Sequence, residues 1–244
     1  MTIAPALHLD GAASFDGVPV FAGVSLDVPA GQWTCLLGSS GVGKSTVLKL
    51  FAGLDAGVEF DGALGASDGP LAGQVALMAQ DDLLLPWLSV TENVLLGARL
   101  RGTRPDHARA QSVLARVGLT DKADRRPGEL SGGQRQRVAL ARTLMEDRPV
   151  VLLDEPFSAL DARTRAQMQE LTAEVLTGRT VLLVTHEPAE AARLGHSIKV
   201  MTETGLIDVT PPPGDIPRPV DDPAVLRVQT SLLAQLREDA NARD

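Results

Sequence analysis

Residues 38–46 have the types and the spacing needed to bind a chain of phosphates. They fit the pattern G-x-x-x-x-G-K-[ST] at every fixed position. The glycines let the backbone curl so that successive N–H groups point inward, toward phosphate oxygens. Lys44 adds a mobile positive charge for the β- and γ-phosphates, Ser45 offers a hydroxyl to Mg²⁺, and Thr46 steadies the α-phosphate end. The predicted phosphate-binding residues are Gly38, Ser39, Ser40, Gly41, Val42, Gly43, Lys44, Ser45 and Thr46.

Two adjacent carboxylates follow four apolar, β-favouring residues at 150–153. This pattern places Asp154 and Glu155 at the carboxyl end of a buried strand, the end at which α/β sheets bind ligands. Asp154 is suited to hold Mg²⁺ through a water molecule, and Glu155 to polarise an attacking water as a general base. Adjacent acids usually mark a solvated strand end, but a phosphate-binding loop in the same chain favours the catalytic interpretation.

Two more polar side chains follow predicted strands. Gln80 ends the apolar run at 74–79, and His186 ends the run at 180–185. Taken alone, Gln80 would be a solvated loop residue and His186 a structural histidine. Both, however, are delivered to the sheet edge that already carries the carboxylates, where His186 could hydrogen-bond a γ-phosphate.

A second anion-binding helix start is predicted near residue 131. Ser131 can cap a helix that begins near Gly133, and the paired glycines leave backbone N–H groups uncovered at the positive end of that helix. A bare Ser-Gly-Gly would be an ordinary turn and cap. The residues of this predicted site are Ser131, Gly132, Gly133 and Gln134.

The elements around the phosphate loop are predicted from periodicity. A buried strand at 33–37 precedes the loop and an apolar helix at 46–53 follows it, which disfavours a chance match of the motif in a turn. Residues 7–9 and 18–28 alternate like antiparallel strands joined by a turn at Asp16 and Gly17. Phe15, beside that turn, is either an aromatic that stacks on adenine or an ordinary core residue. Residues 57–73, rich in glycine, are predicted as a short peripheral hairpin and loop.

The remaining elements form a lobe, a closing hairpin and a tail. Helices are predicted from Ser89 to about residue 100, where Glu92 completes a capping box, and from 105 to 117. A strand pair is expected at 197–209, followed by a tail whose amphipathic segment runs over 223–236. One apolar face of that segment is predicted to comprise Val225, Leu226, Val228, Leu232, Leu233 and Leu236.

Composition narrows the class of protein. A chain of 244 residues with 44% hydrophobic and 22% charged residues can bury a full core. The formal net charge of −8 argues against a nucleic-acid partner, because phosphate neutralisation needs clustered basic residues. Cys35, the single cysteine, falls in a predicted buried strand and so fills the core. No segment approaches a membrane span or a secretory signal, so the chain is expected to stay in the cytoplasm.

With these motifs in this order, the chain resembles the nucleotide-binding subunit of an ATP-binding cassette (ABC) transporter over roughly residues 7–210. The run LSGGQRQR at 130–137 is the most specific part of the resemblance. It implies an α/β fold, a P-loop NTPase (RecA-like) core with an antiparallel β subdomain and an inserted α-helical subdomain. The ATPase domain would span residues 1–210, with the helical subdomain at about 84–147 and the tail at 211–244.

The resemblance also implies ligands and partners. ATP and Mg²⁺ would be bound, with Phe15 stacking on adenine and Gln80 coupling the metal site to an integral membrane permease. Two copies would pair head to tail, holding ATP between the phosphate loop of one and the 131–134 helix start of the other, with Asp161 crossing the interface. The protein would then lie peripherally on the cytoplasmic face of the membrane.

Residues 80–94, with Leu-Pro-Trp at 85–87, are similar to importers of nitrate, sulfonates, taurine and thiamine-precursor pyrimidines. Such importers also use an extracytoplasmic solute-binding protein. Two alternatives remain, a soluble ABC ATPase that acts on DNA or ribosomes and an exporter cassette. Against the first, the chain has neither a second cassette nor a long basic insertion; against the second, exporters more often fuse the cassette to the membrane segment.

Overall fold

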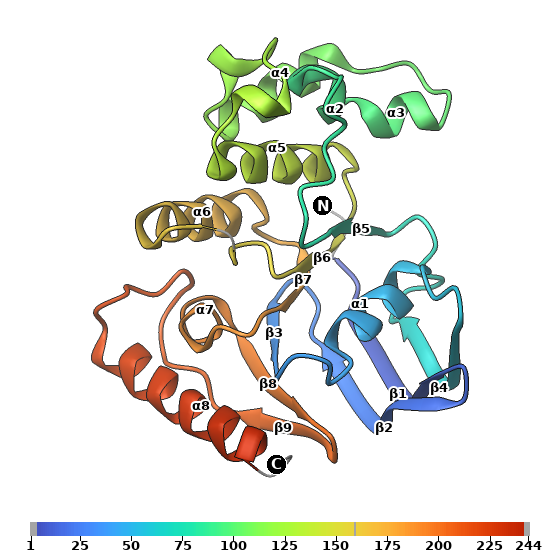
Figure 1. Ribbon diagram of the computed structural model, residues 1–244, viewed down its shortest axis with the longest axis vertical. Helices are drawn as coiled ribbons and strands as arrows, with labels where there is room; N and C mark the ends of the chain where they lie inside the picture. Colours follow the sequence, from blue (N-terminus) through green and yellow to red (C-terminus); the bar gives the residue numbers. More distant parts are fainter. Residues whose placement is uncertain (1–3, 159, 242–244) are drawn as a thin grey trace.

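The computed structural model describes residues 4–158 and 160–241, and two β-sheets organise it (Figure 1). The larger sheet has six strands in the order β5-β6-β7-β3-β8-β9. The first five strands are parallel and β9 pairs antiparallel with β8, as predicted for the closing hairpin. The strands are β3 (Trp33–Leu37), β5 (Val75–Met78), β6 (Val150–Asp154), β7 (Thr180–Val184), β8 (Ser197–Thr202) and β9 (Gly205–Val209).

The smaller sheet is antiparallel, in the order β2-β1-β4, with β1 at Leu7–Phe15, β2 at Val18–Val28 and β4 at Val58–Ala66. The predicted peripheral hairpin at 57–73 is wrong, because β4 is one long strand that pairs with β1 from Leu7↔Ala66 to Phe15↔Val58. Glycine content misled the prediction. A Cβ on Gly62 would lie 2.1 Å from the carbonyl oxygen of Asp10, so the glycine here permits close strand pairing.

Alternate residues of the parallel strands face two different cores. Leu36, Leu152 and Leu182 pack with helix α1 (Lys44–Ala52) and the antiparallel sheet. Cys35, on the opposite face, packs with the helices of the other side and is fully buried. Burial raises the pKa of the Cys35 thiol far above its ordinary value, so the residue stays neutral and fills the core as predicted.

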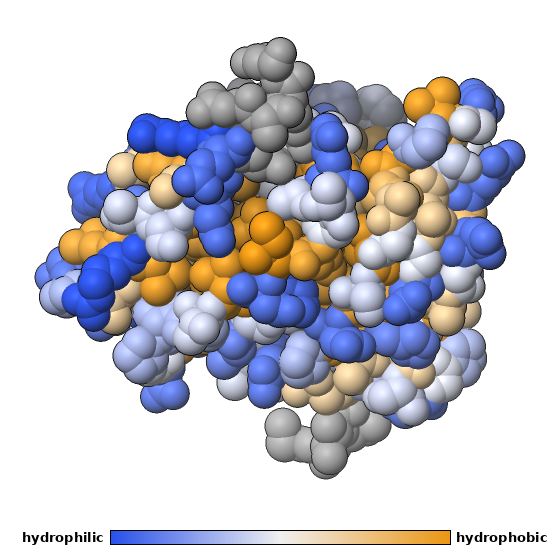
Figure 2. All heavy atoms as spheres, turned by 90° about the horizontal axis from the view of Figure 1, so that it is seen from below, coloured by the Kyte–Doolittle hydropathy of each residue, from blue (hydrophilic) through white to orange (hydrophobic). Residues whose placement is uncertain are grey.

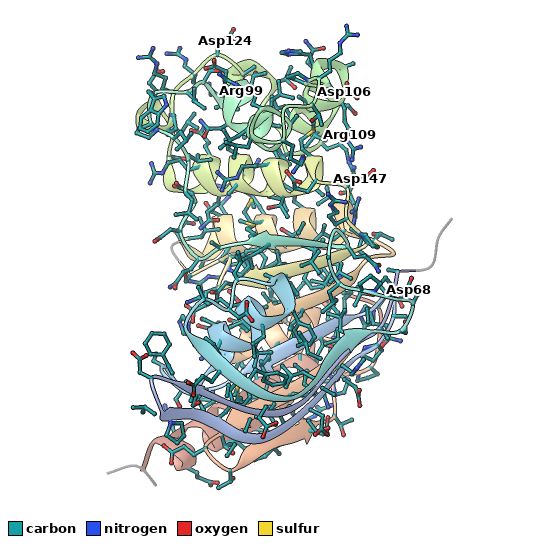
Figure 3. All side chains as sticks on the ribbon, turned by 90° about the vertical axis from the view of Figure 1, so that its right-hand side faces the viewer. Asp68, Arg99, Asp106, Arg109, Asp124 and Asp147 are labelled. Atoms are coloured by element: carbon teal, nitrogen blue, oxygen red, sulfur yellow. The ribbon has the colours of Figure 1, made fainter. Side chains whose placement is uncertain are left out.

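A helical lobe follows β5 and returns to the core at β6. It contains α2 (Val90–Val94), α3 (Leu96–Leu100), α4 (His107–Arg116) and α5 (Gly132–Met145). The predicted capping box is present, since Ser89 Oγ accepts from the Glu92 N–H at 3.2 Å and the Glu92 carboxylate accepts from the Ser89 N–H at 2.8 Å. Where the lobe meets the core, Asp147 pairs with Arg109 of α4 at 3.0 Å (Figure 3). Asp147 also pairs with Arg179 at 3.1 Å.

The last helices are α6 (Ala162–Val175), α7 (Pro188–Leu194) and α8 (Pro223–Asn241). The segment before α8 is tied to α7 by Arg218, a buried side chain that donates to the carbonyl oxygens of Ala192 and Gly195 at 3.1 and 2.9 Å. The predicted apolar face of α8 is divided: Val225 and Leu232 are buried, whereas Leu226 and Leu233 are 47% and 40% exposed. Viewed from below, apolar side chains reach the surface between polar ones (Figure 2).

Candidate functional site

The phosphate loop joins β3 to α1 near the middle of the parallel sheet. Gly43, at a φ of +107°, ends the loop as the N-cap of α1. A Cβ on Gly38 would lie 2.6 Å from the carbonyl oxygen of Met201, so only glycine allows this close approach to β8. Lys44 Nζ donates to the carbonyl oxygens of Gly38 and Ser39, both at 2.8 Å. The loop therefore holds its ammonium group at the positive end of α1, where anions bind.

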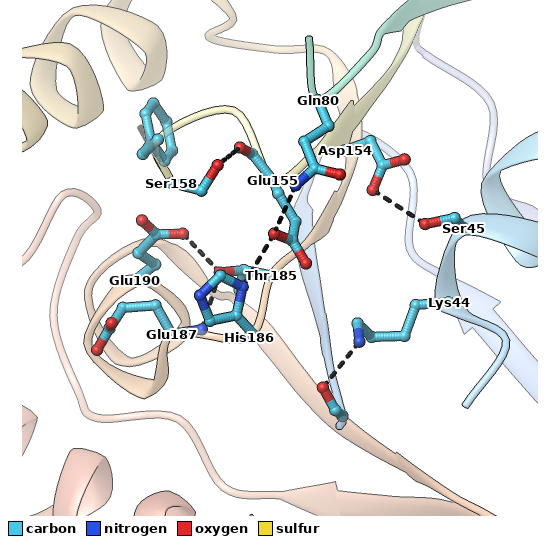
Figure 4. Close-up of polar contacts among 12 residues, drawn as sticks. Lys44, Ser45, Gln80, Asp154, Glu155, Ser158, Thr185, His186, Glu187 and Glu190 are labelled. Carbon is cyan, nitrogen blue, oxygen red and sulfur yellow. Dashed lines mark hydrogen bonds and ion pairs between the residues drawn. The ribbon is translucent and has the colours of Figure 1, made fainter. Parts of the chain in front are cut away.

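The carboxyl ends of β5, β6 and β7 deliver three polar side chains to one place (Figure 4). These strands are neighbours in the sheet, so the residues that follow them lie side by side. Gln80 Nε2 donates to Glu155 Oε2 at 3.3 Å, and His186 Nδ1 lies 2.9 Å from the same oxygen. The carboxylate of Glu155 is thus held between an amide and an imidazole, as a positioned general base requires.

The backbone at Glu155 is unusual and helps to aim its side chain. Its φ is +45°, in the left-handed region that non-glycine residues rarely adopt, at a cost on the order of 1–3 kcal/mol. Hydrogen bonds on both sides of the residue hold this conformation. The Glu155 N–H donates to the carbonyl oxygen of Val184 at 2.9 Å, and Ser158 Oγ donates to the carbonyl oxygen of Glu155 at 3.0 Å.

Asp154 meets the phosphate loop rather than Glu155. Ser45 Oγ donates to Asp154 Oδ1 at 3.3 Å. Burial raises the pKa of Asp154, the Ser45 hydrogen bond opposes this rise, and the negative charge of Glu155 adds to it. A hydroxyl beside a carboxylate whose charge is disfavoured by burial fits a divalent cation, because the cation would compensate that charge.

One cavity of about 420 Å³ collects most of the predicted catalytic and phosphate-binding residues. Val20, which the sequence analysis did not single out, also contributes to its wall. Val42 is buried in the core beneath the loop. The residues that line the cavity are Val20, Ser40, Gly41, Gly43, Lys44, Ser45, Thr46, Gln80, Glu155 and His186.

The second predicted anion site lies elsewhere. Ser131 Oγ accepts from the Gln134 N–H at 3.3 Å and Gln134 Oε1 accepts from the Ser131 N–H at 2.8 Å, so this capping box starts α5 at Gly132. Ser131, Gly133 and Gln134 line a separate cavity of about 440 Å³. Asp161 caps α6, accepting from the Thr164 N–H at 3.0 Å. One chain therefore does not bring the two predicted anion sites together.

Comparison with known proteins decides the family. The family described as "ABC transporter" matches residues 21–158. A relative from Agrobacterium fabrum, named "Aliphatic sulfonates import ATP-binding protein SsuB 2", is 46% identical over 199 residues, covering 79% of this chain and 74% of its own length. The chain belongs to the ABC transporter family.

Two further relatives show the extent of the similarity. A protein of the same aliphatic sulfonate import name from Delftia acidovorans is 40% identical over 98% of this chain and 97% of its own length. The structure of cbiO1 from Clostridium perfringens, described as part of the ABC transporter complex cbiONQ, has a TM-score of 0.74 at 26% identity, covering 83% of this chain and 86% of that one. The family prediction is confirmed, and the chain is an ABC ATPase with the predicted P-loop fold.

Phe15 of the ABC ATPase is not a core residue, because it is 49% exposed. Gly57, at a φ of +83°, lies directly against its ring, where an added Cβ would come within 2.8 Å of Phe15 Cε2. The absence of a side chain at Gly57 therefore leaves the room that the Phe15 ring occupies. No local sequence pattern indicates this contact, because Gly57 lies in the segment 57–73 that is predicted as a short peripheral hairpin and loop.

On the hypothesis that Phe15 stacks on adenine, we expect Gly57→Ala to displace the Phe15 ring and to weaken ATP binding roughly 3- to 10-fold, a part of the 1–3 kcal/mol that stacking of a base on an aromatic contributes. The dissociation constant can be measured by calorimetry. Gly53→Ala is the matched control: its φ is also positive, at +65°, but an added Cβ meets no atom of the described residues within 4 Å. Equal ATP affinities of the two variants would contradict a role of Gly57 in placing the aromatic ring.

The loop after Gln80 is fixed to α5 of the ABC ATPase by two arginines that sequence reasoning missed. Arg135 Nε donates to Asp82 Oδ2 at 2.9 Å, and Arg142 donates to the carbonyl oxygens of Asp82 and Leu83 at 2.7 and 2.8 Å. The two arginines are seven residues apart, which is about two helical turns and places both on the same face of α5. This spacing was the sequence signal that could have identified them. The other end of the loop is held by the buried Asn93, which accepts from the Leu85 N–H at 2.8 Å.

Among residues 4–158 and 160–241, every helix is too short or too polar to cross a bilayer.

Proposed function

We propose that the chain is the ATP-hydrolysing subunit of an ABC importer and that two copies drive solute uptake through a membrane permease. The observation that carries hydrolysis is the convergence of Lys44, Gln80, Glu155 and His186 on one cavity. The cavity is of a size that suits a small-molecule ligand. The import role is supported by the names of the relatives from Agrobacterium fabrum and Delftia acidovorans.

Each group at the cavity has a role in the proposed reaction. The backbone N–H groups of residues 38–46 and the Lys44 ammonium bind the phosphates of ATP. Glu155 accepts a proton from the water that attacks the γ-phosphate, and His186 holds Glu155 and donates to a γ-phosphate oxygen. Ser45, Asp154 and Gln80 would hold Mg²⁺, which when bound neutralises charge on the β- and γ-phosphates.

A second copy completes the site in this proposal. ATP on the phosphate loop of one copy meets residues 131–134 of the other, where the α5 start adds N–H donors and a positive helix end. Asp161 then faces the partner across the interface. The separation of the two anion sites within one chain supports this arrangement, because a single copy offers ATP only one of them.

The permease is proposed to dock beside the loop after Gln80. Leu83 and Trp87 are 60% and 65% exposed, although the loop that carries them is fixed by Arg142 and Asn93. A mainly apolar cavity of about 390 Å³ lies next to Leu83 and is lined also by Leu77, Leu96 and Leu100. Exposed apolar side chains on a fixed loop suit a protein contact. The subunit would thus act from the cytoplasmic face of the membrane, without entering it.

We propose aliphatic sulfonates as the solute class, delivered by an extracytoplasmic binding protein. Residues 1–210 would carry the ATPase, including the helical subdomain at 84–147, and residues 211–244 would be the tail. The names of the relatives and the Leu-Pro-Trp loop at 85–87 support this solute class.

A strain that lacks this chain tests the importer proposal. We expect it to grow normally on sulfate and to fail on an aliphatic sulfonate as the sole sulfur source, because uptake then has no energy source. The wild-type chain should restore growth and Glu155→Gln should not. Unchanged growth of the deletion strain on alkanesulfonates and on taurine, with loss of growth on nitrate or on a thiamine-precursor pyrimidine instead, would replace the solute class. Loss of growth on taurine alone, which is itself an aliphatic sulfonate, would narrow the class to it. Recovery of the tagged chain without any integral membrane protein would favour a soluble ABC ATPase.

A further inference from the structure

A buried carboxylate lies behind the site, and the proposed reaction does not use it. Glu190, in the first turn of α7, has a side chain only 3% exposed. Thr185 Oγ1 donates to Glu190 Oε2 at 2.6 Å. A buried acid costs free energy unless it is compensated, so a carboxylate at this position, four residues after His186, calls for a reason beyond packing.

Glu190 fixes the turn that carries His186. The Thr185 hydroxyl that donates to Glu190 also accepts from the Glu187 N–H at 3.0 Å. Because one hydroxyl has one proton, its donation to Glu190 leaves its lone pairs free to accept from Glu187. The two hydrogen bonds span residues 185–187 and thereby set the backbone on both sides of His186.

Glu190 also faces a second functional segment. Arg165 Nε of α6 lies 4.0 Å from Glu190 Oε1. The same guanidinium donates to the carbonyl oxygens of Phe157 and Leu160, at 3.4 and 3.0 Å. These residues precede Asp161, which is proposed to face the second copy. Glu190 therefore contacts the turn that carries His186 directly. It is linked to the segment before Asp161 through Arg165.

We propose that Glu190 is a positioning residue for ATP hydrolysis, holding the His186 turn and the segment before Asp161 in one fixed arrangement. It acts through Thr185 and Arg165 and does not touch ATP. The inference rests on the proposed role of His186 in the reaction. It predicts that loss of the carboxyl group slows turnover and leaves ATP affinity unchanged, because Lys44 and the phosphate loop are untouched.

Steady-state ATPase kinetics and ATP binding of the full chain test the proposal. Glu190→Leu should lower kcat about 10- to 100-fold, the effect of a small misplacement of catalytic groups, with the dissociation constant of ATP unchanged. Glu190→Gln should restore most of kcat, because its amide oxygen still accepts from Thr185. A merely structural role would not separate kcat from ATP affinity in this way.

Thr185→Val removes the same hydrogen bond from its other end, and it serves as the test if Glu190→Leu does not fold. It should lower kcat to a similar degree, and the double variant Thr185→Val/Glu190→Leu should be no slower than either single variant, because both remove one interaction. Thr172→Val is the matched control. Thr172 is equally buried and its hydroxyl donates to the carbonyl oxygen of Met168 at 2.6 Å, within α6 and away from the turn. Wild-type kcat in Thr185→Val would overturn the proposal.

The pH dependence of stability gives an independent readout. Burial raises the pKa of Glu190 to about 7, and the hydrogen bond from Thr185 opposes the rise. The charged groups that face Glu190 are Arg165 from α6 and Glu187 and His186 from the turn. The thiol of Cys35 also interacts with Glu190, from β3.

The folded state retains the Glu190 proton up to about pH 7, whereas the unfolded chain releases it near pH 4.5. The contribution of the protonated carboxyl group is therefore complete below pH 4.5 and is lost as the pH rises through 7. We expect the free energy of unfolding of the wild type to fall relative to that of Glu190→Gln over this window.

The outcomes separate this inference from the proposed function. No turnover of ATP by the wild type, or wild-type kcat in His186→Ala, would refute the proposed reaction and the Glu190 inference with it. Slow turnover in His186→Ala together with wild-type kcat in Glu190→Leu would overturn only the inference about Glu190.

Discussion

Replacement of Glu155 by glutamine is expected to lower kcat for ATP hydrolysis by about 10²–10⁴-fold, the range that general-base catalysis contributes. The amide has the shape of the carboxylate but cannot take a proton from water. It can still contact Gln80 and His186, which lie 3.3 and 2.9 Å from Glu155 Oε2, so the geometry of the site should persist. ATP affinity should be retained, because Lys44 and the phosphate loop are unchanged.

The same variant should accumulate as an ATP-bound dimer, since hydrolysis no longer ends the bound state. Size-exclusion chromatography with and without ATP measures this shift. Glu187→Gln is the control: it removes an equal charge two residues after Thr185, and its side chain points away from Glu155 (Figure 4). Full activity of Glu155→Gln, or a monomer at saturating ATP, would contradict its role as the base in a two-copy site.

Replacement of Ser131 by arginine is expected to abolish that dimer while ATP still binds to the single chain. Ser131 opens α5 far from the cavity that contains Lys44, so the substitution leaves the phosphate loop intact. It removes the cap hydroxyl, which accepts from the Gln134 N–H at 3.3 Å, and blocks the helix start with a bulky side chain. Hydrolysis should fall about 10²–10³-fold, as when a donor to a reacting oxygen is lost.

The decisive measurement combines the two changes. Glu155→Gln/Ser131→Arg should bind ATP and remain monomeric, whereas Glu155→Gln/Gln111→Arg should dimerise, because Gln111 lies exposed on α4 of the same lobe. Persistence of the ATP-bound dimer in the Ser131 double variant would show that the α5 start does not take part in the interface, and the proposed arrangement of two copies would have to be abandoned.

Most of the parallel sheet could be predicted because its strands are continuous apolar runs. The runs at 150–153 and 180–185 are followed by the polar residues Asp154 and His186, and the run at 33–37 is followed by the glycine-rich phosphate loop. These boundaries located both the strands and the site. The antiparallel sheet was harder to predict from the sequence. In β4, the glycines that allow close pairing with β1 removed the alternation of large side chains on which strand prediction depends. On α8, the position of the core decided which apolar residues are buried, and periodicity alone cannot supply that position.

The site residues could be predicted where a motif fixes their types, as for Lys44, Glu155 and Ser131. Residues that act through another residue gave no such signal. Glu190 and Arg165 are separated by 25 positions and meet only because α6 and α7 pack together. Gly57 lies against Phe15 because the start of β4 pairs with the end of β1. Their contributions depend on tertiary contacts, which a single sequence does not encode in any local pattern.

The two arginines that join α5 to the loop after Gln80 have a mechanical consequence for a transporter. A load applied to Leu83 or Trp87 passes through Arg135 and Arg142 into a helix whose first residue follows Ser131. In the proposed pair of subunits, that helix would face the nucleotide of the opposite copy. A movement of the permease against one subunit would therefore act first on the ATP bound to the other subunit. Each half of the transporter would control the nucleotide site of the opposite half.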